Sequence, residues 1–286
     1  MLLTPCTTSF LCNTSGSGKT RLLFEGLWRY FGLYFTASTK PDGIGSGDLE
    51  QILEQLPRRL VILTDDNWET ALPANQDVAK RRFLSVLYAR LLIFRTFLEC
   101  ANSMPGGIRE EHKSRWLLLQ IAPKTFLESD AFDKLTRQLR DAPDEYLSNQ
   151  IETEKDAITK LLNEHALFCV LDEAQVPTGL ASKCFRSEGT PNVARPVLRE
   201  LIKAWKDSFP RLIVSGTGVS VETLESVLSS AVAKEGQEVV VVTDLGAFDS
   251  GEDQRAYMEQ YLPPQFLDTS SGTELALRAA YWLHGR

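Results

Sequence analysis

A run of small and hydroxyl-bearing residues leads directly into a lysine and a threonine near the start of the chain. Residues 13–20 read Asn-Thr-Ser-Gly-Ser-Gly-Lys-Thr, close to the pattern G-x-x-x-x-G-K-[ST] of phosphate-binding loops. In such loops, successive backbone N–H groups at a helix N-terminus face the negative charges of a polyphosphate. We expect Lys19 to reach the β and γ phosphates and the Thr20 hydroxyl to ligate Mg²⁺. The motif predicts phosphate contacts at Asn13, Thr14, Ser15, Gly16, Ser17, Gly18, Lys19 and Thr20.

The first position of this loop departs from the pattern, because Asn13 stands where the pattern has glycine. Asparagine tolerates the left-handed backbone conformation better than most residues that carry a side chain, so the loop can keep its shape. Gly16 and Gly18 let the backbone approach a ligand without a Cβ in the way. The alternative interpretation is a Ser/Gly turn that precedes Lys-Thr by chance, but the position between an expected strand and an expected helix favours phosphate binding.

Two adjacent carboxylates follow an apolar run later in the chain. Residues 167–171 read Leu-Phe-Cys-Val-Leu and lead into Asp172 and Glu173. In open parallel sheets, ligands bind at the carboxyl ends of the strands. Asp172 is suited to hold Mg²⁺ through water, and Glu173 to orient or deprotonate an attacking water.

Alone, such a pair of acids is equally typical of a helix cap or a solvated strand end. In combination with Lys19 and Thr20, it predicts an enzyme, a Mg²⁺-dependent nucleoside triphosphatase. ATP is the expected nucleotide, because nothing in the sequence resembles the guanine-reading motif N-K-x-D.

Five short apolar runs predict the strands that would carry these residues, over residues 7–12, 31–37, 166–171, 211–215 and 238–243. The spacing of apolar residues predicts helices over residues 20–30, 193–207, 220–234, 253–262 and 273–283, and a mainly helical insertion over residues 48–164. Short continuous apolar strands separated by helices are typical of a parallel sheet covered on both faces. The predicted fold class is therefore α/β, in a single domain over residues 1–286.

Composition and charge argue against several classes of protein. The 286 residues carry 31 Lys plus Arg and 38 Asp plus Glu, a formal charge of −7, which disfavours a protein that coats nucleic acid. The most apolar long segment, residues 83–98, is interrupted by Arg90 and Arg95, so no membrane span is expected. The five cysteines form no C-x-x-C pair, and the first residues lack a basic signal-peptide region. Both features predict an intracellular protein, cytoplasmic or nuclear, with reduced thiols.

The glutamate directly after the aspartate resembles one branch of the P-loop NTPases, which includes the AAA-type ATPases and has an extra strand between the phosphate-loop strand and the acidic strand. This resemblance implies a three-layer sandwich around a mainly parallel, five-stranded sheet in the order 5-1-4-3-2. The fourth strand would then lie beside the first and bring Ser215 or Thr217 near the γ phosphate. We take Thr217 as the catalytic candidate of the two, with a plain glycine-rich turn as the alternative.

A closer resemblance covers the chain from about Pro5 to its last residues. The segments P-C-T-T-S-F-L-C-N-T-S-G-S-G-K-T-R-L-L-F-E-G-L-W, L-D-E-A-Q and R-L-I-V-S-G-T-G-V-S resemble the NTPase domain of fungal Crinkler-type proteins, which are similar to the retrotransposon-hotspot group. The resemblance implies an ATPase joined to other modules, often nuclease-like, and in some members secretion toward a host nucleus. The sequence stops inside an expected helix, which is typical of a fragment that ends within a lid.

Three functions stay open from the sequence: an ATPase that drives conformational change in an attached or partner module, a slowly hydrolysing nucleotide switch, and the motor of a nucleic-acid-directed effector. The partner beyond nucleotide is another protein, a second copy of the chain or nucleic acid, and no membrane is expected. An arginine that stabilises phosphoryl transfer is to be sought among Arg195, Arg199, Arg211 and Arg286.

Overall fold

The computed structural model describes residues 7–13, 17–40, 43–163, 167–187, 194–209, 211–217, 238–243 and 250–283. Within them, five strands form one sheet in which every pairing is parallel. The strands are β1 (Thr7–Asn13), β2 (Gly32–Thr36), β3 (Phe168–Asp172), β4 (Arg211–Thr217) and β5 (Glu238–Val242). The α/β class predicted from the sequence is therefore confirmed.

The strands lie in the order β2-β3-β4-β1-β5, which is the predicted order 5-1-4-3-2 counted from the other edge. β4 lies in the centre: Asn13 of β1 is opposite Thr217 of β4, and Leu171 of β3 is opposite Val214. Because the strands are parallel, their carboxyl ends meet at one edge of the sheet. The loop after β1 and the acids at the end of β3 must therefore share that edge.

The helices have the following bounds in the structure. The α-helices are α1 (Lys19–Arg29), α2 (Asp48–Gln55), α3 (Trp68–Ser103), α4 (Glu111–Ile121), α5 (Pro123–Phe126), α6 (Ala131–Leu139), α7 (Asp144–Leu161), α8 (Gln175–Gly179), α9 (Val197–Trp205), α11 (Gly251–Glu259) and α12 (Ser270–Leu283). The short 3-10 helices are η1 (Leu56–Arg58), η2 (Ser182–Cys184), η3 (Lys206–Ser208) and η5 (Phe266–Asp268).

Most of these boundaries agree with the sequence-based prediction, and the exceptions have local causes. α9 begins at Val197 rather than at residue 193, since Pro196 precedes it and the residue before a proline is disfavoured in helical conformation. α11 begins earlier than predicted because the side chain of Ser250 accepts a hydrogen bond from Asp253 N and caps the helix. The predicted helix over residues 220–234 lies outside the described residues.

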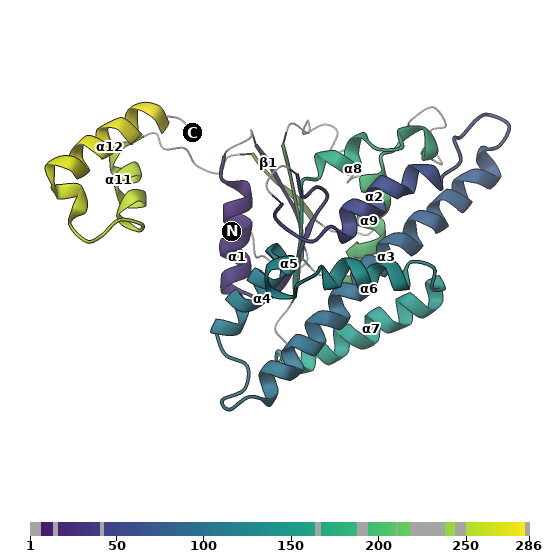
Figure 1. Ribbon diagram of the computed structural model, residues 1–286. Coiled ribbons are helices and arrows are strands. Elements are labelled where there is room, and N and C mark those ends of the chain that lie inside the picture. Colours follow the sequence, from purple (N-terminus) through teal and green to yellow (C-terminus); the bar gives the residue numbers. More distant parts are fainter. Residues whose placement is uncertain are drawn as a thin grey trace.

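Alternate residues of the strands enter two apolar clusters, one on each face of the sheet. Phe35 and Leu171 belong to the cluster that includes residues of α2, α3 and α9, whereas Tyr34 and Val170 belong to the cluster with residues of α1 and α4. Every residue of β2 and β3 is buried, as expected for strands covered on both faces. Figure 1 shows the same arrangement, with α1 and α4 on one side of the sheet and α2 and α9 on the other.

The described residues between β2 and β3 form helices and no strand, in agreement with the predicted helical insertion. α3 is its longest element, with 36 residues, and it packs against α6, α7 and α9. None of the helices in the described part of the chain is both long enough and apolar enough to cross a membrane.

A fully buried ion pair ties this insertion to the sheet. The guanidinium of Arg90 on α3 donates to both carboxylate oxygens of Asp48, the first residue of α2, over 2.6 and 2.9 Å. Its third nitrogen donates to the carbonyl oxygen of Tyr34 on β2 over 3.0 Å. The guanidinium also lies over the rings of Phe35 and Phe132, 4.9 and 4.1 Å from their centroids. One side chain thus connects α2, α3, α6 and β2.

The C-terminal helices α11 and α12 are set apart from the sheet, on the side of α1 that is away from α2 and α9 (Figure 1). Arg21 of α1 lies over the rings of Tyr257 and Tyr261, 4.5 and 4.8 Å from their centroids. Such cation–π contacts contribute about 0.5–1 kcal/mol each at exposed sites. Arg21 thus gives the C-terminal segment one point of contact with the helix that follows the glycine-rich loop.

Replacing Arg90 by methionine is expected to lower the free energy of unfolding by about 3–5 kcal/mol, because Asp48 would stay buried without its partner. The double variant Arg90→Met/Asp48→Asn should recover part of this loss, since it leaves no unpaired charge. Urea unfolding followed by circular dichroism measures both.

The matched control is Arg29→Met, which breaks the Arg29–Glu25 pair on the exposed side of α1, where the two side chains are 67% and 49% exposed. Exposed pairs contribute about 0–1 kcal/mol. Equal losses in Arg90→Met and Arg29→Met would contradict the structural role given to the buried pair.

Candidate functional site

The glycine-rich loop begins where β1 ends and finishes where α1 begins. Gly18 is the N-cap of α1 and has φ 82°, a left-handed conformation that a residue with a Cβ adopts only at a cost. Its carbonyl oxygen accepts the first helical hydrogen bond, from Leu22 N over 3.0 Å. Asn13, Ser17 and Gly18 are described, whereas the predicted contacts Thr14, Ser15 and Gly16 lie outside the described residues.

The residue that departs from the motif has a contact of its own. The side-chain amide of Asn13 donates to the carbonyl oxygen of Thr243, just after β5, over 3.0 Å. This bond ties the start of the loop to the neighbouring strand, which a glycine could not do. The departure from the pattern is therefore accommodated by a specific interaction, and the sequence carried no signal for it.

The side chain of Lys19 is buried and contacts described residues of the loop. Its ammonium donates to the carbonyl oxygen of Asn13 over 2.8 Å and to the hydroxyl of Ser17 over 3.3 Å. Burial lowers the pKa of Lys19, while the carboxylates of Asp172 and Glu173 act in the opposite direction. The ammonium therefore faces the end of β1, in the electrostatic field of both predicted acids.

Thr20 and Asp172 are in direct contact, although 152 residues separate them in the sequence. The Thr20 hydroxyl donates to Asp172 Oδ2 over 2.8 Å. The other oxygen, Oδ1, accepts from the backbone N–H of Glu173 over 3.0 Å, and the Asp172 side chain is buried. The structure thus brings together the two residues that the sequence predicted as Mg²⁺ ligands.

Tyr34 is a further residue of this site, and the sequence analysis did not single it out. Its phenol donates to Asp172 Oδ2 over 3.3 Å, and burial first and then Asp172 raise the pKa of the phenol, so it stays a neutral donor. Its ring meets Phe24 edge-on, and its backbone N–H donates to Gln120 over 2.8 Å. A polar residue within the apolar run of β2 was the only signal for it.

Glu173 and Thr217 lie at the same edge of the sheet and share a neighbour. The side-chain amide of Gln175 donates to Glu173 Oε2 and accepts from the backbone N–H of Thr217, the latter over 3.0 Å. Ser215, the other sensor candidate, is fully buried within β4 and opposite Leu11 of β1. Thr217 at the strand end, opposite Asn13, is therefore better placed than Ser215 to meet a ligand of the loop.

One arginine candidate is wrong for this site. Arg211 is the first residue of β4, opposite Thr7 and Phe168, and so lies at the edge of the sheet away from Thr217. Arg199 forms an ion pair with Glu200 over 2.7 Å. Arg286 lies outside the described residues.

The donor chemistry of the site fits Mg²⁺. Thr20 and Asp172 supply two hard oxygen ligands in contact with each other, and Mg²⁺ in nucleotide sites binds one or two protein carboxylates together with phosphate oxygens and water. Groups of three or more His, Cys, Asp or Glu side chains arranged to hold a metal ion are absent from the described residues. A Mg²⁺ ion here would therefore depend on nucleotide phosphates for its remaining ligands.

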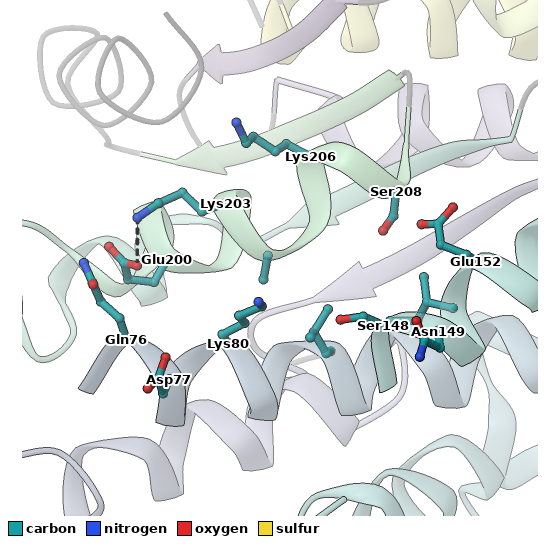
Figure 2. A pocket seen from close by; sticks show the side chains of 13 residues that line it. Gln76, Asp77, Lys80, Ser148, Asn149, Glu152, Glu200, Lys203, Lys206 and Ser208 are labelled. Carbon is teal, nitrogen blue, oxygen red and sulfur yellow. Dashed lines mark ion pairs between the residues drawn. The ribbon is translucent and has the colours of Figure 1, made fainter. Parts of the chain in front are cut away.

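A separate pocket of about 560 Å³ lies between α3, α7, α9 and η3. Figure 2 shows its polar lining, including Lys80, Glu152 and the Glu200–Lys203 ion pair over 3.6 Å. None of the predicted site residues lines this pocket. It is therefore distinct from the edge of the sheet that carries Lys19 and Asp172.

No family model matches the chain, and no curated protein matches it. The resemblance to P-loop NTPases and to Crinkler-type proteins therefore depends on the motifs alone and stays a prediction.

Replacing Gly18 by alanine is expected to cost about 1 kcal/mol of folding free energy, because of the left-handed conformation at this position. Gly179→Ala is the matched control. An added Cβ meets nothing within 4 Å at either position, but Gly179 has no positive φ, so that substitution is expected to be neutral or stabilising by about 0.4–1 kcal/mol. Urea unfolding of both variants measures the two free-energy changes, and equal changes would contradict the left-handed conformation of Gly18.

Proposed function

We propose that this protein is a Mg²⁺-dependent nucleoside triphosphatase with a P-loop NTPase fold, and that ATP is its nucleotide. The observation that carries the proposal is the hydrogen bond between Thr20 and Asp172 over 2.8 Å. It joins the residue after the glycine-rich loop, which follows β1, to the acid at the end of β3, two strands away in the same parallel sheet. Two motif halves predicted independently thus lie in the arrangement that a phosphate-Mg²⁺ site needs.

Each residue has a defined task in this proposal. The backbone of the loop and the Lys19 ammonium bind the phosphates, and Thr20 and Asp172 hold Mg²⁺, which when bound offsets the negative charge on the β and γ phosphates. Glu173 orients the attacking water and takes its proton. Thr217, at the end of β4 and paired with Asn13 at the start of the loop, contacts the γ phosphate.

The sheet order supports the AAA-like branch of the P-loop NTPases, because β4 lies between β1 and β3. The Crinkler-type assignment is a narrower part of the proposal, supported by the segments around Lys19, Asp172 and Thr217. In that reading, hydrolysis drives conformational change in an attached or partner module.

Hydrolysis is tested by measuring phosphate release from ATP with Mg²⁺ by the wild type, Lys19→Ala and Glu173→Gln. Loss of the general base in Glu173→Gln lowers the rate by about 10²–10⁴-fold. Lys19→Ala loses its contact with the phosphates instead, and we expect a loss of at least about 100-fold in both variants. Lys160→Ala, at an exposed position of α7, should hydrolyse at the wild-type rate. Equal rates in all four proteins would end the proposal.

Nucleotide binding is tested separately by thermal shift with and without Mg²⁺. A ligand at 100 times its Kd stabilises the native state by about 2.7 kcal/mol, so ATP with Mg²⁺ should raise the melting temperature of the wild type and of Glu173→Gln. Lys19→Ala should lose most of this shift. No shift with any nucleoside triphosphate would also end the proposal.

A slowly hydrolysing switch is the second candidate, and a specific chain of contacts favours it. Tyr34 donates to Asp172 through its phenol and accepts from Arg90 through its carbonyl oxygen, so the site and the helical insertion meet at one residue. Nucleotide binding could then reposition α3. Fast multiple turnover by the isolated chain would contradict this version.

A further inference from the structure

Gln175, the first residue of α8, lies between the predicted general base and the end of β4. Its Oε1 accepts from Thr217 N over 3.0 Å, and its Nε2 donates to Glu173 Oε2. A backbone N–H can only donate a hydrogen bond, so the carbonyl end of the amide must face Thr217. The amino end, which can only donate, is then left facing the carboxylate. The orientation of the amide is therefore set by the backbone of β4.

The backbone of Glu173 is held firmly, in a conformation rare for a residue with a side chain. Its φ is 58°, in the left-handed region that costs about 1 kcal/mol or more outside glycine. Its N–H donates to Asp172 Oδ1 over 3.0 Å, its carbonyl oxygen accepts from Val176 N over 3.0 Å, and the next residue, Ala174, donates to Ser215 O over 2.8 Å. These contacts set where the side chain begins.

Three side-chain torsions separate the Glu173 carboxylate from its backbone. The backbone contacts do not restrain these torsions. A general base must lie within hydrogen-bond reach of the water it activates, and a displacement of about 1 Å can cost as much as 100-fold in rate. Among the described residues, the Gln175 amide donates a hydrogen bond to this carboxylate. A hydrogen bond to an ionised acceptor is stronger than one between neutral groups, so this bond can restrain the side chain.

We propose that Gln175 is a positioning residue, which holds the Glu173 carboxylate in its working orientation and links it to the end of β4 at Thr217. This inference depends on the proposed hydrolysis. Because Thr217 is the residue proposed to meet the γ phosphate, the same amide connects the group that contacts the phosphate with the group that activates the water. Gln175 needs no contact with substrate to act in this way.

Gln175→Glu separates the two bonds of the amide. The variant has the same shape and can still accept from Thr217 N, but it replaces the donor that faces Glu173 by a second carboxylate oxygen. Two carboxylates in direct contact repel each other, so the Glu173 side chain is expected to turn away from residue 175. Gln175→Met keeps the length of the side chain and removes both bonds.

The experiment measures kcat and KM for ATP hydrolysis together with hydrogen exchange at the Thr217 amide, in the wild type, both Gln175 variants and Lys19→Ala. We expect kcat to fall by about 10- to 100-fold in Gln175→Glu and Gln175→Met, with KM within about twofold of wild type. Protection of the Thr217 amide should be lost in Gln175→Met and kept in Gln175→Glu. A general loss of structure would move KM, the melting temperature and kcat together.

Gln150→Glu is the matched control, since Gln150 on α7 accepts from the Tyr88 hydroxyl through Oε1, a bond that a glutamate can also accept. Suppose that the wild type hydrolyses ATP, that Lys19→Ala does not, and that both Gln175 variants keep the wild-type kcat. This result would overturn the role of Gln175 and leave the proposed hydrolysis standing. Absence of turnover in the wild type would overturn the proposed hydrolysis and this role with it. If Gln175→Glu unfolds below the assay temperature, the kcat and KM of Gln175→Met test the role of Gln175, with the same expected changes.

Discussion

The central place of β4 in the sheet determines where each candidate residue lies, because its residues pair with β1 on one side and with β3 on the other. Parallel pairing puts the loop after β1, the acids after β3 and the polar end of β4 at one edge. The Thr20–Asp172 hydrogen bond connects the segment after β1 with the end of β3, and Gln175, just after β3, accepts from Thr217 N at the end of β4. The contacts between these segments therefore depend on the carboxyl ends of β1, β3 and β4 lying at the same edge of the sheet.

The other constraint is the buried Arg90–Asp48 pair. A charge removed from water is tolerated only with a partner and further hydrogen bonds, and Arg90 finds its remaining acceptor in the carbonyl oxygen of Tyr34. The side chain of the same Tyr34 contacts Asp172. The helical insertion and the acidic site therefore both contact the same residue of β2.

The candidate site gathers one cation and two anions in a partly buried place. Burial disfavours the charged form of Lys19, and the two carboxylates favour it. The ammonium also has loop oxygens as hydrogen-bond acceptors. These oxygens hold the ammonium at the proposed phosphate site, where a bound polyphosphate would replace weak neutral acceptors by strong anionic ones.

The sequence by itself determined the α/β class and the residue types of the site, because short buried strands and the Lys19-Thr20 and Asp172-Glu173 pairs are local patterns. The strand order came from resemblance to a family, and the structure agrees with it. Only the tertiary structure decided that Thr20 touches Asp172, that Tyr34 and Gln175 belong to the site, that Asn13 bonds to the end of β5, and that Arg211 lies at the wrong edge. These facts depend on pairings between residues far apart in the chain, and periodicity reports which face of an element is buried but not which distant side chain it will meet.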